Sequence, residues 1–194
     1  MTPKRFAKIS DVVSKRQKYL TLVLENIHDP HNVSAILRSA DAVGVGEIYL
    51  IYNTNKFPKI GKNSSGSARK WIDLRKFKSV ESCFETLKSK NFRIFSTHIE
   101  DTDKGKSLFD LNLTGKTAIV LGNEHSGVSD EVVELSDANF FIPMHGMVQS
   151  LNVSVAAAIC LYESLRQRQA KGMYNRSQFT KKELKDKLED YSKR

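Results

Sequence analysis

The sequence predicts an α/β domain in which a mostly parallel β-sheet is flanked by helices, with a short helical extension at each end. Short apolar runs of strand length alternate along the chain with longer segments whose apolar residues recur at helical spacing, an order typical of parallel sheets. The chain has 194 residues, 40% of them hydrophobic, which is enough for one core. We therefore expect one domain over 19–168, preceded by a basic helical extension (1–18) and followed by another (169–194).

The first half of the chain opens on an amphipathic segment. Phe6, Ile9 and Val13 recur at helical spacing with basic residues between them, which predicts a helix. A second helix is expected over 32–43, because its apolar residues share one stripe and Gly44 follows as a stop signal. The other elements expected here are strands at 20–25, 47–51 and 92–98 and a helix at 80–90.

The second half continues the same alternation. Ser129 is a good N-cap for the helix that begins SDEVVEL. The other expected elements are strands at 117–121 and 139–143 and helices at 152–167 and 180–191. The polar loop 53–70 is long enough to contact a ligand, and a plain exposed loop fits it equally well.

Composition excludes several classes of protein. No apolar run reaches the roughly 18 residues that a membrane helix needs, and the N-terminus lacks the apolar stretch of a secretory signal. Cys83 and Cys160 form no CxxC or zinc spacing and are typical of reduced thiols in a cytosolic protein. The five histidines show no metal-binding spacing. We expect a cytoplasmic protein without a membrane segment or a metal.

The positive charge is confined to the two ends of the chain. The formal net charge is +9, of which residues 1–18 contribute +5 and residues 166–194 contribute +6, so the middle carries −2. Basic flanks of this kind are in many proteins simply solvent-exposed surfaces without a partner. Two basic tails on a near-neutral domain fit a polyanionic partner better, because each phosphate contact releases counterions.

Three loops after expected strands, at 96–98, 122–127 and 144–150, are suited to ligand binding. Ligands of open parallel sheets bind beyond the carboxyl ends of the strands, and Gly122 and Gly127 let backbone approach a ligand closely. The GxxxxGK[ST] and GxGxxG nucleotide motifs and the GxSxG hydrolase motif are absent. The residues by themselves therefore predict an α/β domain that binds an anionic polymer and has room for a small ligand.

Three segments resemble, in order, the signature motifs of the SPOUT-class RNA 2′-O-ribose methyltransferases. They are 32–45 (NVSAILRSADAVGV), 119–131 (IVLGNEHSGVSDE) and 142–163 (IPMHGMVQSLNVSVAAAICLYE). Further segments, at 15–32, 64–71 and 165–176, are similar to the branch of this class that methylates guanosine 18 of tRNA. The resemblance covers nearly the whole chain.

The resemblance implies a fold, a cofactor and partners that the patterns above do not reveal. It implies a SPOUT fold with a deep C-terminal trefoil knot, which the general rule against knots would not suggest. It also implies a homodimer, S-adenosyl-L-methionine (AdoMet) as cofactor and tRNA as substrate. Only about 18 residues precede the first strand, whereas rRNA enzymes of the class usually carry a larger N-terminal domain.

The resemblance also assigns residues to roles. By it, Arg38 is the catalytic arginine; without it, Arg38 would be interpreted as solvent-facing and Asn32 as a helix N-cap. A guanidinium is a poor general base, so we assign Arg38 to gripping a phosphate beside the reactive ribose. The other catalytic candidates are Asn32, Glu124, Ser150 and Asn152. The cofactor candidates are Thr97, Leu121, Gly122, Glu124, Gly127, Ile142, Met144 and Leu151.

Contact with RNA is expected from the basic ends of the chain. The candidates are Arg5, Lys8, Arg16, His31, Lys90, Arg166, Arg168 and Arg176. Two alternatives remain open: an enzyme of the same class that methylates another ribose of tRNA or rRNA, and a non-catalytic RNA-binding module on the same fold.

Overall fold

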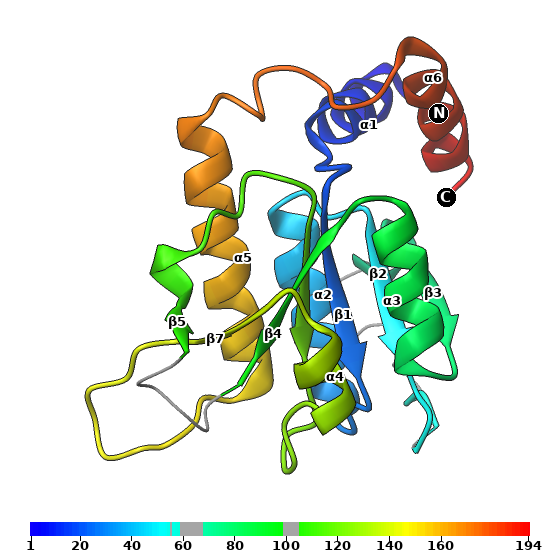
Figure 1. Cartoon of the computed structure of the whole chain (residues 1–194). Coiled ribbons are helices and arrows are strands. Elements are labelled where there is room, and N and C mark those ends of the chain that lie inside the picture. Colours follow the sequence, from blue (N-terminus) through cyan, green and yellow to red (C-terminus); the bar gives the residue numbers. More distant parts are fainter. Residues whose placement is uncertain (55, 59–67, 99–104) are drawn as a thin grey trace.

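The computed structural model describes residues 1–194 except 55, 59–67 and 99–104 (Figure 1). Its strands are β1 (Leu20–Glu25), β2 (Glu47–Ile51), β3 (Asp73–Phe77), β4 (Arg93–Thr97), β5 (Lys106–Ser107), β6 (Thr117–Leu121) and β7 (Ala138–Phe141). Its helices are α1 (Pro3–Lys15), α2 (Pro30–Ala42), α3 (Val80–Ser89), α4 (Asp130–Leu135), α5 (Val153–Ala170) and α6 (Lys181–Lys193), with short 3-10 turns η1 (Ala68–Lys70) and η2 (Leu108–Asp110).

The strands form one parallel sheet in the order β3-β2-β1-β6-β4-β7-β5. The central strands β1 and β6 are buried along their whole length and are mostly apolar on both faces, as in a sheet covered on both sides. The predicted parallel sheet flanked by helices is therefore confirmed.

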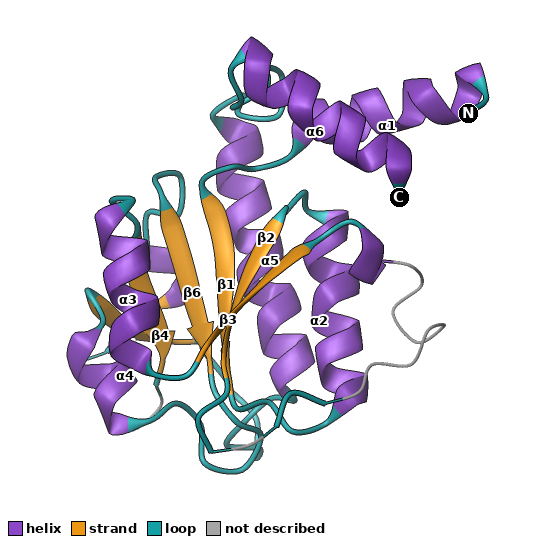
Figure 2. Cartoon of the chain, turned by 90° about the vertical axis from the view of Figure 1, so that its right-hand side faces the viewer, coloured by secondary structure: helices purple, strands orange, loops and turns teal. Residues whose placement is uncertain are grey.

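Two apolar layers cover the sheet. Helices α2 and α5 pack on one face, and α3 and α4 pack on the other (Figure 2). The first half of helix α5, residues 153–162, is mostly apolar, and the helix packs beside α2. No helix among the described residues is long and apolar enough to cross a membrane.

Helices α1 and α6 pair with each other beyond the amino ends of the strands, and we call this pair the arm (Figures 1 and 2). Its small apolar core contains Ile9 and Val13 of α1 and Tyr191 of α6, with Trp71 of the domain packed against them. The first and last segments of the chain, far apart in sequence, thus form one unit.

The sequence missed two strands, β3 and β5. Strand β3 (DLRKF) lies at the sheet edge with charged residues half exposed, so it lacks the apolar run used to recognise strands. Strand β5 has only two residues. The expected loop 53–70 lies between β2 and β3 and ends with η1. Residues 55 and 59–67 of this loop lie outside the described part of the chain.

Candidate active site

A pocket of 790 Å³ lies where the carboxyl ends of β4, β6 and β7 meet, at the end of the sheet opposite the arm. It is built by the three loops that the sequence singled out as ligand loops. The predicted residues that line it are Thr97, Leu121, Gly122, Glu124, Gly127, Ile142, Met144, Ser150, Leu151 and Asn152. Sequence reasoning missed other lining residues, among them Asp130, Phe140, Phe141, Gln149 and Ala156. Asp130, Gln149 and Ala156 lie within the motif segments 119–131 and 142–163, so a closer assignment of those segments would have included them.

The loop between β6 and α4 forms the floor of the pocket as a tight backbone turn. Asn123 and Gly127 exchange two backbone hydrogen bonds, each 2.9 Å. Gly127 has φ +71°, a conformation that side chains disfavour. A Cβ on Gly122 would lie 2.1 Å from the backbone of Gly127 and Val128, so only glycine fits there. Both glycines are therefore required by the turn itself.

Glu124 ties this turn to the start of α2. Its carboxylate accepts hydrogen bonds from the backbone N–H groups of His28 (3.0 Å) and Asp29 (3.1 Å) and from the Asn32 side chain (2.9 Å). Burial alone would raise the pKa of Glu124, but the bonds from Asn32, His28 and Asp29 outweigh it and lower that pKa below its ordinary value. Glu124 is therefore held as a carboxylate.

Asn32 and Asn152 extend this link to the third motif. The Asn152 amide donates to Asn32 Oδ1 at 3.1 Å, while Asn152 Oδ1 accepts from the backbone N–H of Ser154 and caps α5. A chain of side-chain hydrogen bonds, Glu124–Asn32–Asn152, thus joins the three motif segments.

The N-cap interpretation of Asn32 is wrong. Asp29 caps α2, accepting from the backbone N–H of His31 at 2.8 Å, and Asn32 lies in the first helical turn. Helix α2 therefore begins two residues earlier than the sequence pattern predicted, because Pro30 at the first position suits a helix start.

Arg38 does not line the pocket of its own chain. It is exposed on α2 and makes no hydrogen bond or ion pair with another described residue. Six residues separate it from Asn32, which places it about 9 Å further along the helix axis. Arg38 and Ser150 are thus the two catalytic candidates whose polar groups the described part of the chain leaves uncommitted, whereas Glu124, Asn32 and Asn152 already bind one another.

Two of the expected RNA-binding arginines, Arg16 and Arg168, are buried, at 1% and 0% exposure, and this corrects their assignment. Arg16 donates to the backbone oxygen of Val45 at 3.0 Å and pairs with Asp41, which anchors the arm to the domain. Arg168 donates to the backbone oxygens of Leu113, Tyr19 and Gly115. Burial lowers the pKa of Arg168 to about 10. Carbonyl oxygens, and not phosphates, are the partners of Arg168.

The remaining candidates for RNA contact are distributed over the surface. Arg5, Lys8, His31 and Arg176 are exposed. Arg166 is exposed but held by Glu163 through two hydrogen bonds of 2.8 Å. Lys90 is half-buried, and its ammonium donates to the Tyr49 hydroxyl at 2.6 Å.

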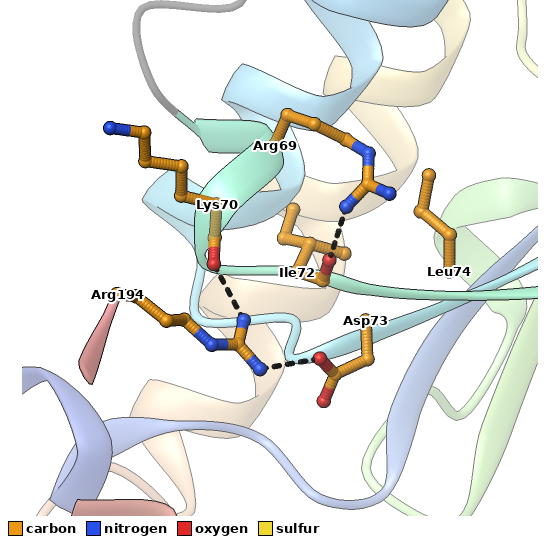
Figure 3. Close-up of a pocket in the computed structure, with 6 residues that line it drawn as sticks. All are labelled: Arg69, Lys70, Ile72, Asp73, Leu74 and Arg194. Atoms are coloured by element: carbon orange, nitrogen blue, oxygen red, sulfur yellow. Dashed lines mark hydrogen bonds and ion pairs between the residues drawn. The ribbon is translucent and has the colours of Figure 1, made fainter. Parts of the chain in front are cut away.

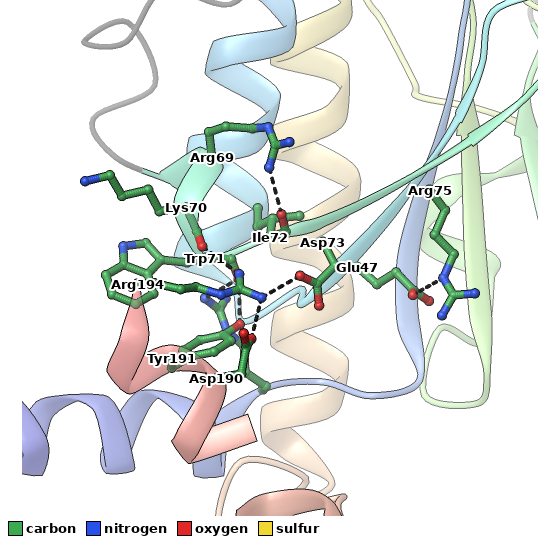
Figure 4. A network of polar contacts seen from close by, with 11 residues as sticks. Glu47, Arg69, Lys70, Trp71, Ile72, Asp73, Arg75, Asp190, Tyr191 and Arg194 are labelled. Atoms are coloured by element: carbon green, nitrogen blue, oxygen red, sulfur yellow. Dashed lines mark hydrogen bonds and ion pairs between the residues drawn. The ribbon is translucent and has the colours of Figure 1, made fainter. Parts of the chain in front are cut away.

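A second hollow, of 540 Å³, lies on the seam between the arm and the domain (Figure 3). Arg194, the last residue, donates there to the Lys70 backbone oxygen (2.6 Å) and to Asp73 (2.7 Å) and also contacts Asp190. Nearby, the Tyr191 hydroxyl donates to the Trp71 backbone oxygen at 2.6 Å (Figure 4). These contacts serve to dock the arm.

Comparisons with known proteins agree on one family. The model of the SpoU rRNA methylase family matches residues 19–162. The chain is 43% identical to the tRNA (guanosine(18)-2′-O)-methyltransferase of Thermus thermophilus, over 90% of this chain and 89% of that protein. It is 40% identical to the protein of the same name from Escherichia coli, over 91% of this chain and 76% of that protein.

Solved structures are similar too. The A. aeolicus TrmH/SpoU tRNA modifying enzyme matches with a TM-score of 0.91 and 37% identity, covering 98% of this chain and 95% of that one. The SpoU methyltransferase AviRb from Streptomyces viridochromogenes, in complex with AdoMet, matches with a TM-score of 0.71 and 26% identity, covering 80% of this chain and 62% of that one.

Proposed function

The chain belongs to the SpoU rRNA methylase family, and we propose that it methylates the ribose 2′-hydroxyl of guanosine 18 in tRNA. The reaction transfers a methyl group from AdoMet to the ribose oxygen, with loss of the hydroxyl proton, and leaves S-adenosylhomocysteine (AdoHcy). Relatives 40% and 43% identical over nine-tenths of this chain carry this activity in their names. We also propose that the protein acts in the cytoplasm, because its proposed substrate is tRNA.

The main support for the proposal is the hydrogen-bonded chain Glu124–Asn32–Asn152, which links the three motif segments beside the pocket. Three acceptor positions of the Glu124 carboxylate are used within the protein, and about one remains for a ligand. We assign Glu124, Asn32 and Asn152 chiefly to positioning the loops.

The residues that line the pocket suit the chemistry of AdoMet. Leu121, Ile142 and Leu151 offer apolar contact to a flat base, and Glu124 and Asp130 offer negative charge to a sulfonium cation. When bound, AdoMet supplies an activated methyl group. Gly122 and Gly127 keep side chains off the floor so that backbone N–H and C=O groups can meet the adenosine.

Arg38 and Ser150 then act on the RNA. A guanidinium stays protonated, so Arg38 grips the phosphate beside the reactive ribose and stabilises negative charge as it develops on the 2′-oxygen. Ser150 lines the pocket, and we assign it a hydrogen bond to the ribose. In this proposal the rate acceleration comes from the orientation of the reacting groups and from electrostatic stabilisation of the transition state.

We further propose a homodimer. Val155 and Tyr162, seven residues apart on α5, are 47% and 54% exposed, and the half-buried Ile159 lies between them in sequence. These positions share a helix face, which gives an apolar surface suited to a second copy. Arg38, outside the pocket of its own chain, fits a site completed by a partner.

Two further features of the fold are proposed from the family resemblance. We propose that the segment from Met144 through α5 is threaded as a deep trefoil knot. Its return from β7 to pack beside α2 supports this. We also propose that 1–18 and 169–194 act as basic extensions of a methyltransferase domain over 19–168.

An rRNA ribose is the second candidate substrate. The chain is 36% identical to the 23S rRNA (guanosine-2′-O-)-methyltransferase RlmB of Vibrio parahaemolyticus over 84% of this chain, but spans 65% of that protein. The nearly full coverage of the Thermus relative favours tRNA.

Incubation of the pure protein with AdoMet and unmodified tRNA, followed by mass-spectrometric mapping, tests the proposal. We expect one 2′-O-methyl group, on guanosine 18. Methylation at another ribose would assign the second candidate. No product from a folded protein that binds tRNA would indicate a non-catalytic module.

A further inference from the structure

A group of lysines and aromatic rings lies at the amino ends of the strands, at the opposite end of the sheet from the pocket. Lys18 and Tyr19 precede β1, and Lys116 precedes the adjacent strand β6. The linker from α5 to α6 passes over this end (Figure 1) and contributes Phe179, and Lys187 follows on α6. We call Lys18, Tyr19, Lys116, Phe179 and Lys187 the lysine–aromatic cluster.

Each ammonium group of the cluster lies beside a ring. Lys18 Nζ is 5.7 Å from the centroids of both Tyr19 and Phe179. Lys116 Nζ is 5.2 Å from the Tyr19 centroid, and Lys187 Nζ is 5.2 Å from that of Phe179. Two lysines that share one ring are at most about 11 Å apart. This separation is close to the screening length of about 8 to 10 Å at physiological salt, so the two positive charges still repel each other. The rings therefore fix a row of three cations.

The cluster lacks the carboxylates that would neutralise it. Glu183 pairs with Lys18 at 2.6 Å and also accepts from the backbone N–H of Thr180, which lowers the pKa of Glu183 to about 2. Among the described residues, no carboxylate pairs with Lys116 or Lys187; Lys116 donates to the Lys90 backbone oxygen at 2.9 Å. Three ammonium groups thus face one carboxylate.

We propose that the lysine–aromatic cluster binds backbone phosphates of the RNA substrate. An anion relieves the repulsion among the lysines, and ammonium groups already held by rings lose little freedom on contact. The exposed Lys181 and Lys182 begin helix α6, which also contributes Lys187 to the cluster. This inference rests on the proposed function, because it assumes that RNA is the substrate.

The buried Arg168 gives the cluster a rigid base. Its guanidinium donates hydrogen bonds to the backbone oxygens of Tyr19, a cluster residue, and of Gly115, which precedes the cluster residue Lys116. Loss of Arg168 would therefore weaken RNA binding indirectly, by loosening both segments, although the side chain itself contacts no RNA.

The position of the cluster has a consequence for the substrate. Strand β1 has six residues, so about 20 Å of sheet separates its two ends. An RNA bound at the pocket and at the cluster of one chain must span at least that distance, which a folded tRNA does.

The test compares the tRNA affinity of a Lys116→Gln/Lys187→Gln double variant with that of the wild type, by fluorescence anisotropy over a series of KCl concentrations. The control is Lys76→Gln on β3, because Lys76 also lies over a ring, that of Phe57 at 4.8 Å, but stands apart from the cluster. Loss of two phosphate contacts should weaken binding about tenfold or more near physiological salt and reduce the log–log salt slope by about 1.4 to 1.8. The KM for tRNA should rise, and kcat should stay unchanged.

A Lys116→Arg/Lys187→Arg variant keeps the charge and should bind within about threefold of the wild type. Equal affinity and salt slope in the Gln double variant and the Lys76→Gln control would overturn the proposal. So would an Arg double variant as weak as the Gln one, since packing and not charge would then be responsible. Absence of methylated product from the wild type would instead reject the proposed function, and the affinity comparison would still decide on the cluster.

Discussion

Individual residues of the site divide by whether their polar atoms are committed within the protein. Glu124, Asn32 and Asn152 satisfy one another and the loop backbone, so they fix the geometry of the pocket. The polar groups of Arg38 and Ser150 have no such partner among the described residues, and we propose that they contact the substrate. The division predicts different consequences for substitutions in the two groups.

Replacement of Arg38 should remove activity without loosening the fold. Arg38 is exposed and fills no core space, so Arg38→Ala should change the free energy of unfolding by no more than about 0.5 kcal/mol. Methyl transfer should fall at least about a hundredfold. Arg38→Lys should be severely defective as well, because lysine lacks the two-pronged grip on phosphate. Single-turnover assays and thermal melting check this; near-normal transfer by Arg38→Ala would refute the role.

Acid should weaken cofactor binding through Glu124. Its folded pKa is lowered from the ordinary 4.5, so its stabilising bonds are fully present above that pH and are lost as the pH falls through the folded value. AdoHcy affinity measured by calorimetry should therefore fall below about pH 4.5. A Glu124→Gln variant lacks this titration, so its affinity should change less over the same interval. Parallel curves for the two proteins would show that another group titrates.

Among the elements, the loop between β6 and α4 depends most directly on glycine. Gly122→Ala places a Cβ against backbone at 2.1 Å, which no side-chain movement can relieve. We expect a loss of at least about 2 kcal/mol in stability and of measurable AdoMet binding. Gly115→Ala is the matched control, because its Cβ would meet nothing within 4 Å and its φ is not positive. Similar behaviour of the two variants in melting and calorimetry would contradict this account.

The arm is a docked element, and this changes how its charge should be tested. Deleting 1–18 would remove the buried Arg16 and leave Asp41 without its partner, so it should destabilise the domain. Replacing the exposed Lys4, Arg5 and Lys8 by Gln should leave melting unchanged, weaken tRNA binding and flatten its salt dependence. AdoMet affinity, measured in parallel, should be the same as in the wild type. Unaltered tRNA binding would show that α1 does not contact RNA.

At the scale of the whole molecule, the proposed dimer should depend on the exposed face of α5. The wild type should sediment at twice the 22.0 kDa of one chain. Val155→Asp/Tyr162→Asp should sediment as a monomer, because it places two charges in an apolar interface. Phe109→Asp, at a 56% exposed site on η2, is the control and should remain dimeric. A monomeric wild type would contradict the proposal.

The sequence by itself determined the alternation of strands and helices, the parallel sheet and the three loops that line the pocket. These depend on local patterns: short apolar runs of strand length, helical spacing of apolar residues, glycines where a turn needs them, and strand ends that share one edge. The central strands and α2 were found within about two residues, because their apolar patterns are strong.

Only the tertiary structure decided which charged side chains are free. Arg16 and Arg168 belong to the basic ends of the sequence, but Asp41 and backbone oxygens from distant segments surround them. Likewise, the two rings near Lys18, Lys116 and Lys187 come from segments about 160 residues apart. The formal charge of a residue is local, whereas its burial and its partners depend on how distant segments pack, and this packing determines whether a charge holds the fold or meets a ligand.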